Sequence, residues 1–468
     1  MRIGLLAIIA ALAPAATAEA ASITQLPGAR GCLHDVPRDG CVNSRATDFS
    51  ESAVVSPDGR HVYVTGGSND FGALTTYARD RATGALRQLP GKAGCTTSNG
   101  DVDEGTALAQ FCTRAGRISS LNAIVISPNG RTVYTSSGSP QEHRQVIAVF
   151  RRDPASGRLT QLQCLTPQAD VEGCAQGAFQ TPLGLALARD GRTLYAGGES
   201  LSTFPIAEDG DIAGPGACTL LLGNETRAGG LCAGVRVDAT RRQITHLLLS
   251  PDGRRLYAGA GGDADDGSQV QAYDLDAANP AAAPRPAECA GVPGCPRARG
   301  LNDLEDLAVA PDGGAVYTAS ARFTVTDDIG LEGYTASAIG IFAAPSLRQL
   351  PGRRGCVEAG AERGAVPATC APGRELLSAE AIEVTPSGRH VVAAFGDSAK
   401  VVLYARNRET HALRRVAGAR GCVEQQPLTT TLCTAGRGIH GTRDIAISPD
   451  GRNAYVVTFP GVTVFRLR

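Results

Sequence analysis

Short apolar runs alternate with turn sequences along almost the whole chain. In the clearest case, the apolar run Ala53–Val55 is followed by the turn residues Pro57–Arg60 and then by a second apolar run, His61–Val64. Proline and glycine supply the backbone angles that a tight reversal requires, and apolar runs of this length are typical of strands. The pattern therefore predicts a β-hairpin with the turn sequence Ser-Pro-Asp-Gly-Arg or a variant of it.

This hairpin unit occurs seven times. The turns begin 60 to 75 residues apart, and self-similarity at a nearly fixed period indicates a repeat or propeller architecture. The first residues of the seven turns are Ser56, Ser127, Ala188, Ser250, Ala310, Thr385 and Ser448.

Two more strands follow the hairpin in the first repeat, Leu74–Ala78 and Ala85–Leu89, with a second turn between them. The stretches between the strands have no helical periodicity, which favours a propeller blade over a unit of alternating strands and helices. The sequence therefore predicts an all-β fold, a single seven-bladed β-propeller of four-stranded antiparallel blades. Its seven first strands lie side by side around the central axis.

The last repeat has only three strands, of which Val462–Leu467 is the third. The missing fourth strand matches the other end of the chain, because Ile23–Cys32 has the same pattern as Leu86–Cys95 and Leu347–Cys356. We expect the N-terminal strand to close the ring by pairing with the last blade, which removes an exposed sheet edge.

The first twenty residues have the pattern of a secretory signal peptide. Arg2 precedes the apolar run Leu5–Leu12, and the small residues of Ala15–Ala20 offer cleavage sites after Ala18 and Ala20. The apolar run is much shorter than the ~20 residues of a membrane span. We therefore predict a signal peptide over residues 1–20, a propeller over residues 21–468, and a secreted or periplasmic protein without a membrane span.

Fourteen cysteines form seven close pairs in the sequence. An even number of cysteines in an exported chain indicates disulfides, and zinc sites favour a closer spacing than any of these pairs has. Each pair brackets the connection from a fourth strand to the next blade, so we expect sequential pairing within blades. The predicted disulfides are Cys32–Cys41, Cys95–Cys112, Cys164–Cys174, Cys218–Cys232, Cys289–Cys295, Cys356–Cys370 and Cys422–Cys433.

Charge and composition exclude several classes of protein. The chain has 45 Lys and Arg against 46 Asp and Glu, and this balance argues against a general nucleic-acid binder. It contains no Trp, which excludes WD repeats. We expect a monomer whose partner is a protein or a small molecule on the top face, the face with the loops between second and third strands.

The repeat resembles a known family. Val54–Val64 and its six relatives resemble the YVTN-type repeats of the lactonase-like seven-bladed propellers, which include bacterial phosphogluconolactonases and fungal muconate-lactone cyclases. Arg79–Leu86 and Arg152–Leu159 resemble that family's turn between third and fourth strands. The resemblance covers nearly the whole mature chain and implies lactone chemistry. Its motifs are structural, and none of that family's catalytic motifs is found here. The family's sugar-phosphate enzymes are cytoplasmic, whereas this chain is predicted to be exported with a disulfide in every blade.

Polar residues converge where the first strands begin. Alignment of the seven strands gives two adjacent columns that become rings at the mouth of the central channel, and converging carboxylates perturb one another's pKa values. The candidate ligand-binding residues in these columns are Glu51, Asn122, Thr245, His246, Glu305, Asp306, Glu380, Arg443 and Asp444.

Three of these residues are candidates for catalysis. Arg443 would stabilise the oxyanion of an opening lactone, while His246 or Glu380 would activate water. The alternative is a solvated polar mouth in which Arg443 and a glutamate form one structural ion pair.

Two acidic loops indicate possible calcium ligands, although neither has the spacing of an EF-hand. The alternative is a solvated acidic turn in each case, and we expect no other cofactor. The candidate ligands are Asp101, Asp103, Glu104, Asp263, Asp265 and Asp266.

Two functions remain open at this point. The first hypothesis is an exported ligand- or protein-binding scaffold that uses the disulfide-bonded top face. The alternative is a lactone hydrolase that acts at the mouth of the channel, and the residues alone do not decide whether the protein is an enzyme.

Overall fold

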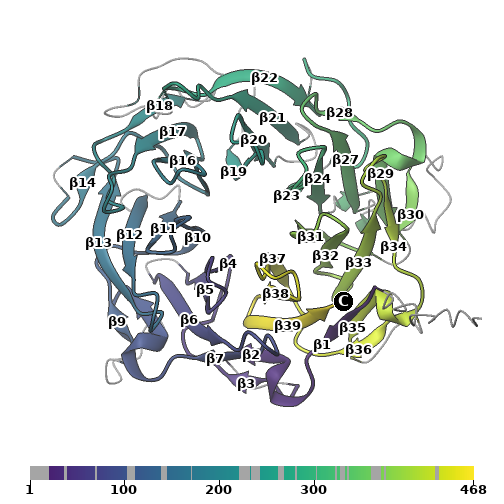
Figure 1. Cartoon of the computed structure of the whole chain (residues 1–468), viewed down its shortest axis with the longest axis horizontal. Coiled ribbons are helices and arrows are strands. Elements are labelled where there is room, and N and C mark those ends of the chain that lie inside the picture. Colours follow the sequence, from purple (N-terminus) through teal and green to yellow (C-terminus); the bar gives the residue numbers. More distant parts are fainter. Residues whose placement is uncertain are drawn as a thin grey trace, which may run out of the picture.

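The chain forms a ring of seven β-sheets around a central axis (Figure 1), as predicted. The computed structural model describes residues 21–35, 39–68, 71–102, 111–138, 145–169, 171–220, 232, 243–261, 268–279, 282–292, 294–301, 303–321, 324–326, 332–334, 337–359, 370–373, 376–426 and 432–468. Within these ranges, no helix is long and apolar enough to cross a membrane.

The first and second strands of each blade form the predicted hairpin, with the first strands innermost (Figure 1). The first strands are β4 (Ala53–Val55), β10 (Leu121–Ile126), β15 (Gly184–Leu187), β19 (Ile244–Leu249), β23 (Leu304–Val309), β31 (Ala379–Val384) and β37 (Thr442–Ile447). The second strands are β5 (His61–Gly66), β11 (Thr132–Ser137), β16 (Thr193–Gly197), β20 (Arg255–Ala260), β24 (Ala315–Ser320), β32 (His390–Phe395) and β38 (Asn453–Thr458).

The third strands continue each sheet outward. They are β6 (Ala73–Arg79), β12 (Val146–Arg152), β17 (Ser200–Pro205), β21 (Gln269–Asp274), β27 (Ala338–Ala343), β33 (Lys400–Arg406) and β39 (Gly461–Leu467). A short hairpin of β25 (Thr324–Thr326) and β26 (Glu332–Tyr334) lies between β24 and β27 in the sequence.

The fourth strand is continuous in three blades and broken into two pieces in four. The continuous strands are β13 (Leu159–Thr166), β18 (Ala217–Leu220) and β22 (Arg285–Ala290). The broken strands are β1 (Ile23–Gln25) with β2 (Cys32–His34), β7 (Leu86–Gln88) with β8 (Cys95–Thr97), β28 (Arg348–Gln349) with β29 (Cys356–Ala359), and β34 (Leu413–Arg415) with β35 (Cys422–Gln425). A single turn of 3-10 helix separates the two pieces, namely η1 (Gly28–Arg30), η2 (Gly91–Gly94), η4 (Gly352–Gly355) and η5 (Ala419–Gly421).

A short parallel strand adds an outer edge to five blades. With the two pieces of a broken fourth strand counted separately, the sheets have four to six strands rather than the predicted four. These edge strands are β3 (Val42–Asn43), β9 (Thr113–Arg114), β14 (Ala175–Gln176), β30 (Ala371–Gly373) and β36 (Thr434–Gly436). The sequence did not reveal them because two or three residues are too few for an alternating pattern to be visible.

All seven predicted disulfides are present, and the structure describes no free cysteine. The Cα–Cα distances of 4.8 to 5.4 Å lie in the ordinary range for disulfides. The first cysteine of each pair lies in a fourth strand, and in five blades the second immediately precedes the parallel edge strand. Each disulfide therefore fixes the outer edge of one blade.

The N-terminal segment closes the ring, as predicted. β1 and β2 both pair with β39, which places Ile23 opposite Leu467 and Cys32 opposite Thr463. In Figure 1 the N-terminal strands β1 and β2 lie beside the C-terminal strand β39, and β3 lies outside β2. Ile23 is fully buried in a cluster that includes Phe465, so closure joins the two ends of the chain through the core as well as through backbone hydrogen bonds.

The core lies between neighbouring blades. Tyr63 of β5 is fully buried in a cluster with Val133 and Phe150 of the second blade, and the same kind of cluster repeats around the ring. A hydrophobic core of this type depends on the closed ring, because each blade buries its face only against its neighbours.

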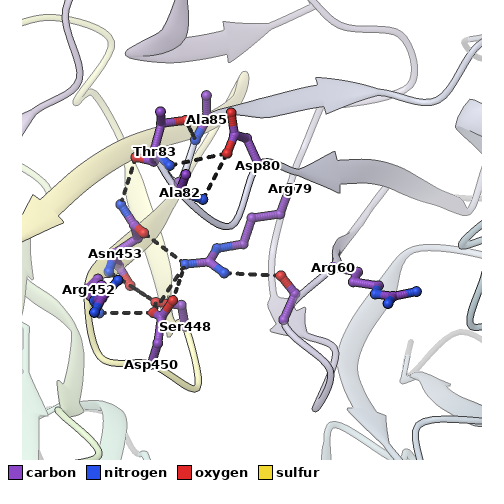
Figure 2. A network of polar contacts seen from close by, with 12 residues as sticks. Arg60, Arg79, Asp80, Ala82, Thr83, Ala85, Ser448, Asp450, Arg452 and Asn453 are labelled. Atoms are coloured by element: carbon purple, nitrogen blue, oxygen red, sulfur yellow. Dashed lines mark hydrogen bonds and ion pairs between the residues drawn. The ribbon is translucent and has the colours of Figure 1, made fainter.

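Three blade interfaces also contain a buried arginine that the sequence did not reveal. The Arg79 guanidinium at the end of β6 reaches into the last blade, where it donates to Asp450, Asn453 and the hydroxyl of Tyr455. Figure 2 shows the Arg79 side chain extending toward the turn of the last blade that contains Asp450 and Asn453. The equivalent contacts are Arg152 with Asp58 and Tyr63, and Arg406 with Asp312 and Tyr317.

Candidate functional site

The first strands of five blades contain a β-bulge where the sequence places the polar columns. In β23, Leu304 is opposite Ser320 and Asp306 is opposite Ala319, so Glu305 is the extra residue. A bulge directs successive side chains toward the same space and is common beside functional sites. The five extra residues are Asn122, Thr245, Glu305, Glu380 and Arg443.

The five bulged residues line the mouth of the channel, which is a cavity of 240 Å³. All nine predicted ligand-binding residues line this cavity, together with Ser52, Ala123 and Leu183. Alignment of the repeats therefore predicted the convergence of these side chains, whereas a role in ligand binding remains a proposal.

The glutamates of the mouth hold protons more tightly than glutamates in water. Burial, with help from Glu380 and Asp303, raises the pKa of Glu305 to about 8. Burial also raises the pKa of Glu51 and of Glu380, although Arg443 opposes both shifts. At neutral pH, Glu305 is therefore a protonated acid that can donate a hydrogen bond or a proton.

Arg443 lies among these glutamates without an ion pair to a carboxylate of any described residue. The positive charge of Arg443 opposes the rise in the pKa of Glu51, Glu305 and Glu380, so Arg443 is near all three. Arg443 is an exposed residue and lines the mouth of the channel. The geometry therefore differs from the structural ion pair that was the alternative for this residue.

Asp306 and Asp444 link neighbouring blades. Asp444 Oδ2 accepts hydrogen bonds of 2.8 Å from the Ser52 hydroxyl and from the Ala53 backbone N–H, and Asp306 Oδ2 accepts one of 2.8 Å from the Ile382 N–H. These amides belong to the first strand of the next blade, where an unpaired buried N–H would be costly. Both aspartates line the mouth, but much of their accepting capacity satisfies backbone amides.

His246 lies between Thr245 and Asp306. Its Nδ1 is 3.0 Å from the Thr245 hydroxyl oxygen, and its Nε2 is 3.9 Å from Asp306 Oδ1. Burial lowers the pKa of His246 to about 4, while burial and the neighbouring Asp444 raise the pKa of Asp306 well above its usual value. His246 is therefore a neutral imidazole at pH 7, and the 33% of its side chain that remains exposed faces the channel.

A second space, the lower chamber, continues the channel below the mouth. It has a volume of 360 Å³. Ser52, Ala123, Thr245, His246, Asp306 and Asp444 line both spaces. Most other residues of the lower chamber are apolar and come from the middle of the first strands, for example Val54, Val125, Leu248 and Ala446.

Glu383 is the functional candidate that the sequence reasoning missed. It lines the lower chamber, and burial together with the nearby Asp444 raises its pKa to about 8. The sequence did contain a signal, because the other six repeats have an apolar residue at this position of the first strand. Those residues are Val54, Val125, Ala186, Leu248, Ala308 and Ala446.

The predicted calcium loops fall largely outside the described residues, which exclude Asp103, Glu104, Asp263, Asp265 and Asp266. Asp101 is described, and its backbone N–H donates to the Asn99 side chain within the turn. Among the described residues, no group of three or more His, Cys, Asp or Glu side chains is placed to hold a metal ion. Calcium binding stays a prediction.

Comparison with known proteins finds similarity of fold. No family model and no curated protein sequence matches the chain. The periplasmic gluconolactonase of Pseudomonas aeruginosa is a structural neighbour with 17% identity and a TM-score of 0.50, covering 85% of this chain and 88% of its own. Hydrazine synthase from Kuenenia stuttgartiensis has 13% identity and a TM-score of 0.52 over 92% and 98% of the two chains. The WD40 repeats of RRP9 have 11% identity and a TM-score of 0.50 over 96% and 98%.

These similarities show that the chain has a propeller fold. Three proteins with different names share the fold at low identity, and function resides in sites built on folds rather than in the folds themselves. The functional argument therefore depends on the residues of the channel.

Proposed function

We propose that the protein hydrolyses lactones at the mouth of its channel. The observation that carries this proposal is that a single cavity contains a protonated glutamic acid, a neutral imidazole and a guanidinium that forms no ion pair with any described residue: Glu305, His246 and Arg443. The similarity to a periplasmic gluconolactonase supports the same activity.

In the proposed reaction, the lactone carbonyl faces Arg443, which stabilises the negative charge of the tetrahedral intermediate. Neutral His246 accepts a proton from the attacking water, whose oxygen forms the new bond to the carbonyl carbon. As the ring C–O bond breaks, Glu305 donates its proton to the leaving oxygen, and the product is a hydroxy acid. Solvent then returns the proton from His246 to Glu305.

Glu380 is the second candidate for the base. It lies in the same cavity, and its carboxyl accepts a hydrogen bond from the Ser378 hydroxyl. The pH dependence of kcat/KM separates the two candidates. If His246 is the base, activity is lost as pH falls through about 4 and, because Glu305 loses its proton, as pH rises through about 8.

The test is turnover of a panel of aliphatic and sugar lactones. We expect hydrolysis by the wild-type protein and a decrease in kcat/KM of roughly 100-fold or more for His246→Gln and for Arg443→Gln. Arg389→Gln is the matched control, because Arg389 is an exposed arginine of the turn between the first and second strands of its blade.

Two outcomes would overturn parts of the proposal. Absence of turnover across the whole panel would refute the enzyme and favour a binding module that uses the disulfide-bonded face. Activity that persists in His246→Gln but is lost in Glu380→Gln would assign the base to Glu380.

We also propose that residues 1–20 are a signal peptide and that the mature protein is periplasmic or secreted. Seven disulfides are typical of proteins that fold in an oxidising compartment. N-terminal sequencing of the exported protein should give Glu19 or Ala21 as the first residue. A chain that retains Met1 would contradict this proposal.

A further inference from the structure

The lower chamber differs in chemistry from the mouth above it. Apart from the shared residues and Glu383, its wall is formed by apolar residues of the first strands and by Pro386, in the turn of the opposite face. With 360 Å³, the lower chamber is within the range of about 300–1,000 Å³ that is common for small-molecule sites. The reaction proposed above uses the mouth and leaves this chamber without a role.

The shared residues connect the two spaces. His246 and Asp306 border the mouth on one side and the lower chamber on the other. A substrate whose reacting carbonyl lies beside His246 and Arg443 therefore has its substituent next to the opening of the lower chamber. Apolar walls favour an alkyl group there, because its burial removes apolar surface from water.

We propose that the lower chamber binds an alkyl substituent of the substrate, so that the preferred substrates are neutral lactones with an unbranched alkyl chain. This inference rests on the proposed function, because it names the substrate class of the same site. It excludes phosphorylated sugar lactones as good substrates.

Charge supports the exclusion of phosphorylated substrates. Among the residues that line the mouth, Arg443 is the only cation at neutral pH, and it lies among Glu51, Glu305 and Glu380. A phosphate group requires several donors or cations to replace its water. One arginine that also stabilises the oxyanion does not supply them.

Glu383 makes the chamber testable by a matched pair of variants. At this position of the first strand, blade four has Leu248. Glu383→Leu makes this wall uniformly apolar and should strengthen binding of the alkyl chain. Glu383→Gln keeps a neutral polar group of the same shape, so kcat/KM should rise more steeply with chain length in Glu383→Leu than in Glu383→Gln at pH 7.

The first experiment measures kcat/KM at pH 7 for γ-lactones whose side chain grows from methyl to octyl, together with 6-phosphogluconolactone. We expect kcat/KM to rise about threefold per methylene until the chamber is full, and the phosphorylated lactone to be at least 100-fold poorer than the best alkyl lactone. Equal kcat/KM along the series, or a preference for the phosphorylated lactone, would overturn the inference.

Variants of residues in the wall of the lower chamber test whether the dependence of kcat/KM on chain length arises there. Ala446→Phe fills the space, so the ratio of kcat/KM for the hexyl lactone to that for the methyl lactone should fall at least tenfold. Val125→Ala enlarges the space and should shift the optimum toward longer chains, which keeps the test valid if the phenylalanine variant does not fold. Ratios equal to that of the wild type in both variants would place the alkyl chain elsewhere.

Binding of alkyl-substituted γ-lactams, measured by calorimetry, separates this inference from the proposed function, because lactams resist hydrolysis. Lactam affinity that rises with chain length in a protein without lactonase activity would refute the enzyme and retain the chamber. Lactone turnover with no dependence on chain length in either assay would retain the enzyme and refute the chamber.

Discussion

All seven blades have the same disulfide at the outer edge, whereas their inner ends present five different types of residue to the channel. Every outer edge contains a disulfide between a fourth strand and the loop that follows it. At the inner ends, the first strands present Glu51, Asn122, Leu183, Thr245, Glu305, Glu380 and Arg443 to the same cavity. In this protein the features shared by all blades build the ring, and the candidate functional residues lie at positions that differ between blades.

The physical reason is the symmetry of the ring. Each outer edge faces solvent and has to be stabilised in the same way, so the same disulfide can occur in all seven blades. The inner ends face one another across the channel, where seven copies of one side chain would give a ring of like groups. Asymmetry among the blades is therefore required for an acid, a base and a cation to meet.

The largest expected effect on the repeated framework comes from opening the ring. Deletion of residues 22–32 removes β1, the first residue of β2 and one partner of the Cys32–Cys41 disulfide. It also exposes the edge of β39, so we expect aggregation, loss of cooperative unfolding and a Tm lower by roughly 10 °C or more. A chain that lacks only residues 1–20 is the control, and equal thermal unfolding of the two chains would show that closure contributes nothing.

An interface arginine should have a smaller effect. The Arg152 side chain is 1% exposed and donates to Asp58 and Tyr63 of the neighbouring blade. Because Asp58 remains partly exposed, we expect Arg152→Met to lower the free energy of unfolding by about 2–3 kcal/mol in denaturant titrations. Arg192→Met removes a solvent-exposed ion pair with Glu208 and should cost less than about 1 kcal/mol. A similar cost for both variants would contradict this account of the interface.

The titratable side chains at the inner ends of the blades should make the stability of the fold depend on pH. The folded pKa values of Glu305 and Glu383 are both raised to about 8, so the folded protein retains two protons that the unfolded chain releases above about 4.5. Stability should therefore decrease as pH rises toward 8, by at most about 1.4 kcal/mol per pH unit for each group.

His246 works in the opposite direction at lower pH, since its pKa is lowered to about 4 and its contribution is lost as pH falls below 6.5. Thermal unfolding between pH 6.5 and 8 separates the effect of the buried carboxyl groups from that of His246. The double variant Glu305→Gln, Glu383→Gln should have a smaller slope than the wild type, because it lacks two of these groups, and a slope equal to that of the wild type would contradict the assignment.

The sequence predicted the repeated part of the molecule almost completely. The seven turns and the pairing of all cysteines follow from patterns that recur in every blade, and the closure by Ile23–Cys32 follows from a pattern that recurs in some of them. The parallel edge strands did not emerge because they are only two or three residues long. The contact of Arg152 with Asp58 did not emerge because it joins residues 94 positions apart and leaves no periodic signal.

The candidate site was predicted in part. Counting back from the first strands placed Glu305, Arg443 and their neighbours together, although the β-bulges that turn adjacent side chains into the channel were not foreseen. The double role of Asp306, which lines the mouth and accepts the Ile382 N–H, depends on the exact separation of two blades. Sequence position alone does not provide that separation.

The most direct test of the central claim compares one inner and one outer variant in the same two assays. Glu305→Gln removes the proposed proton donor, and the double variant Cys164→Ser, Cys174→Ser removes one edge disulfide. We predict that Glu305→Gln lowers kcat/KM for the best lactone about 100-fold at pH 7 with a Tm at or above that of the wild type. The cysteine variant should lose about 2–3 kcal/mol of stability and keep kcat/KM within about twofold. The opposite pattern, full activity in Glu305→Gln and lost activity in a folded cysteine variant, would contradict the account.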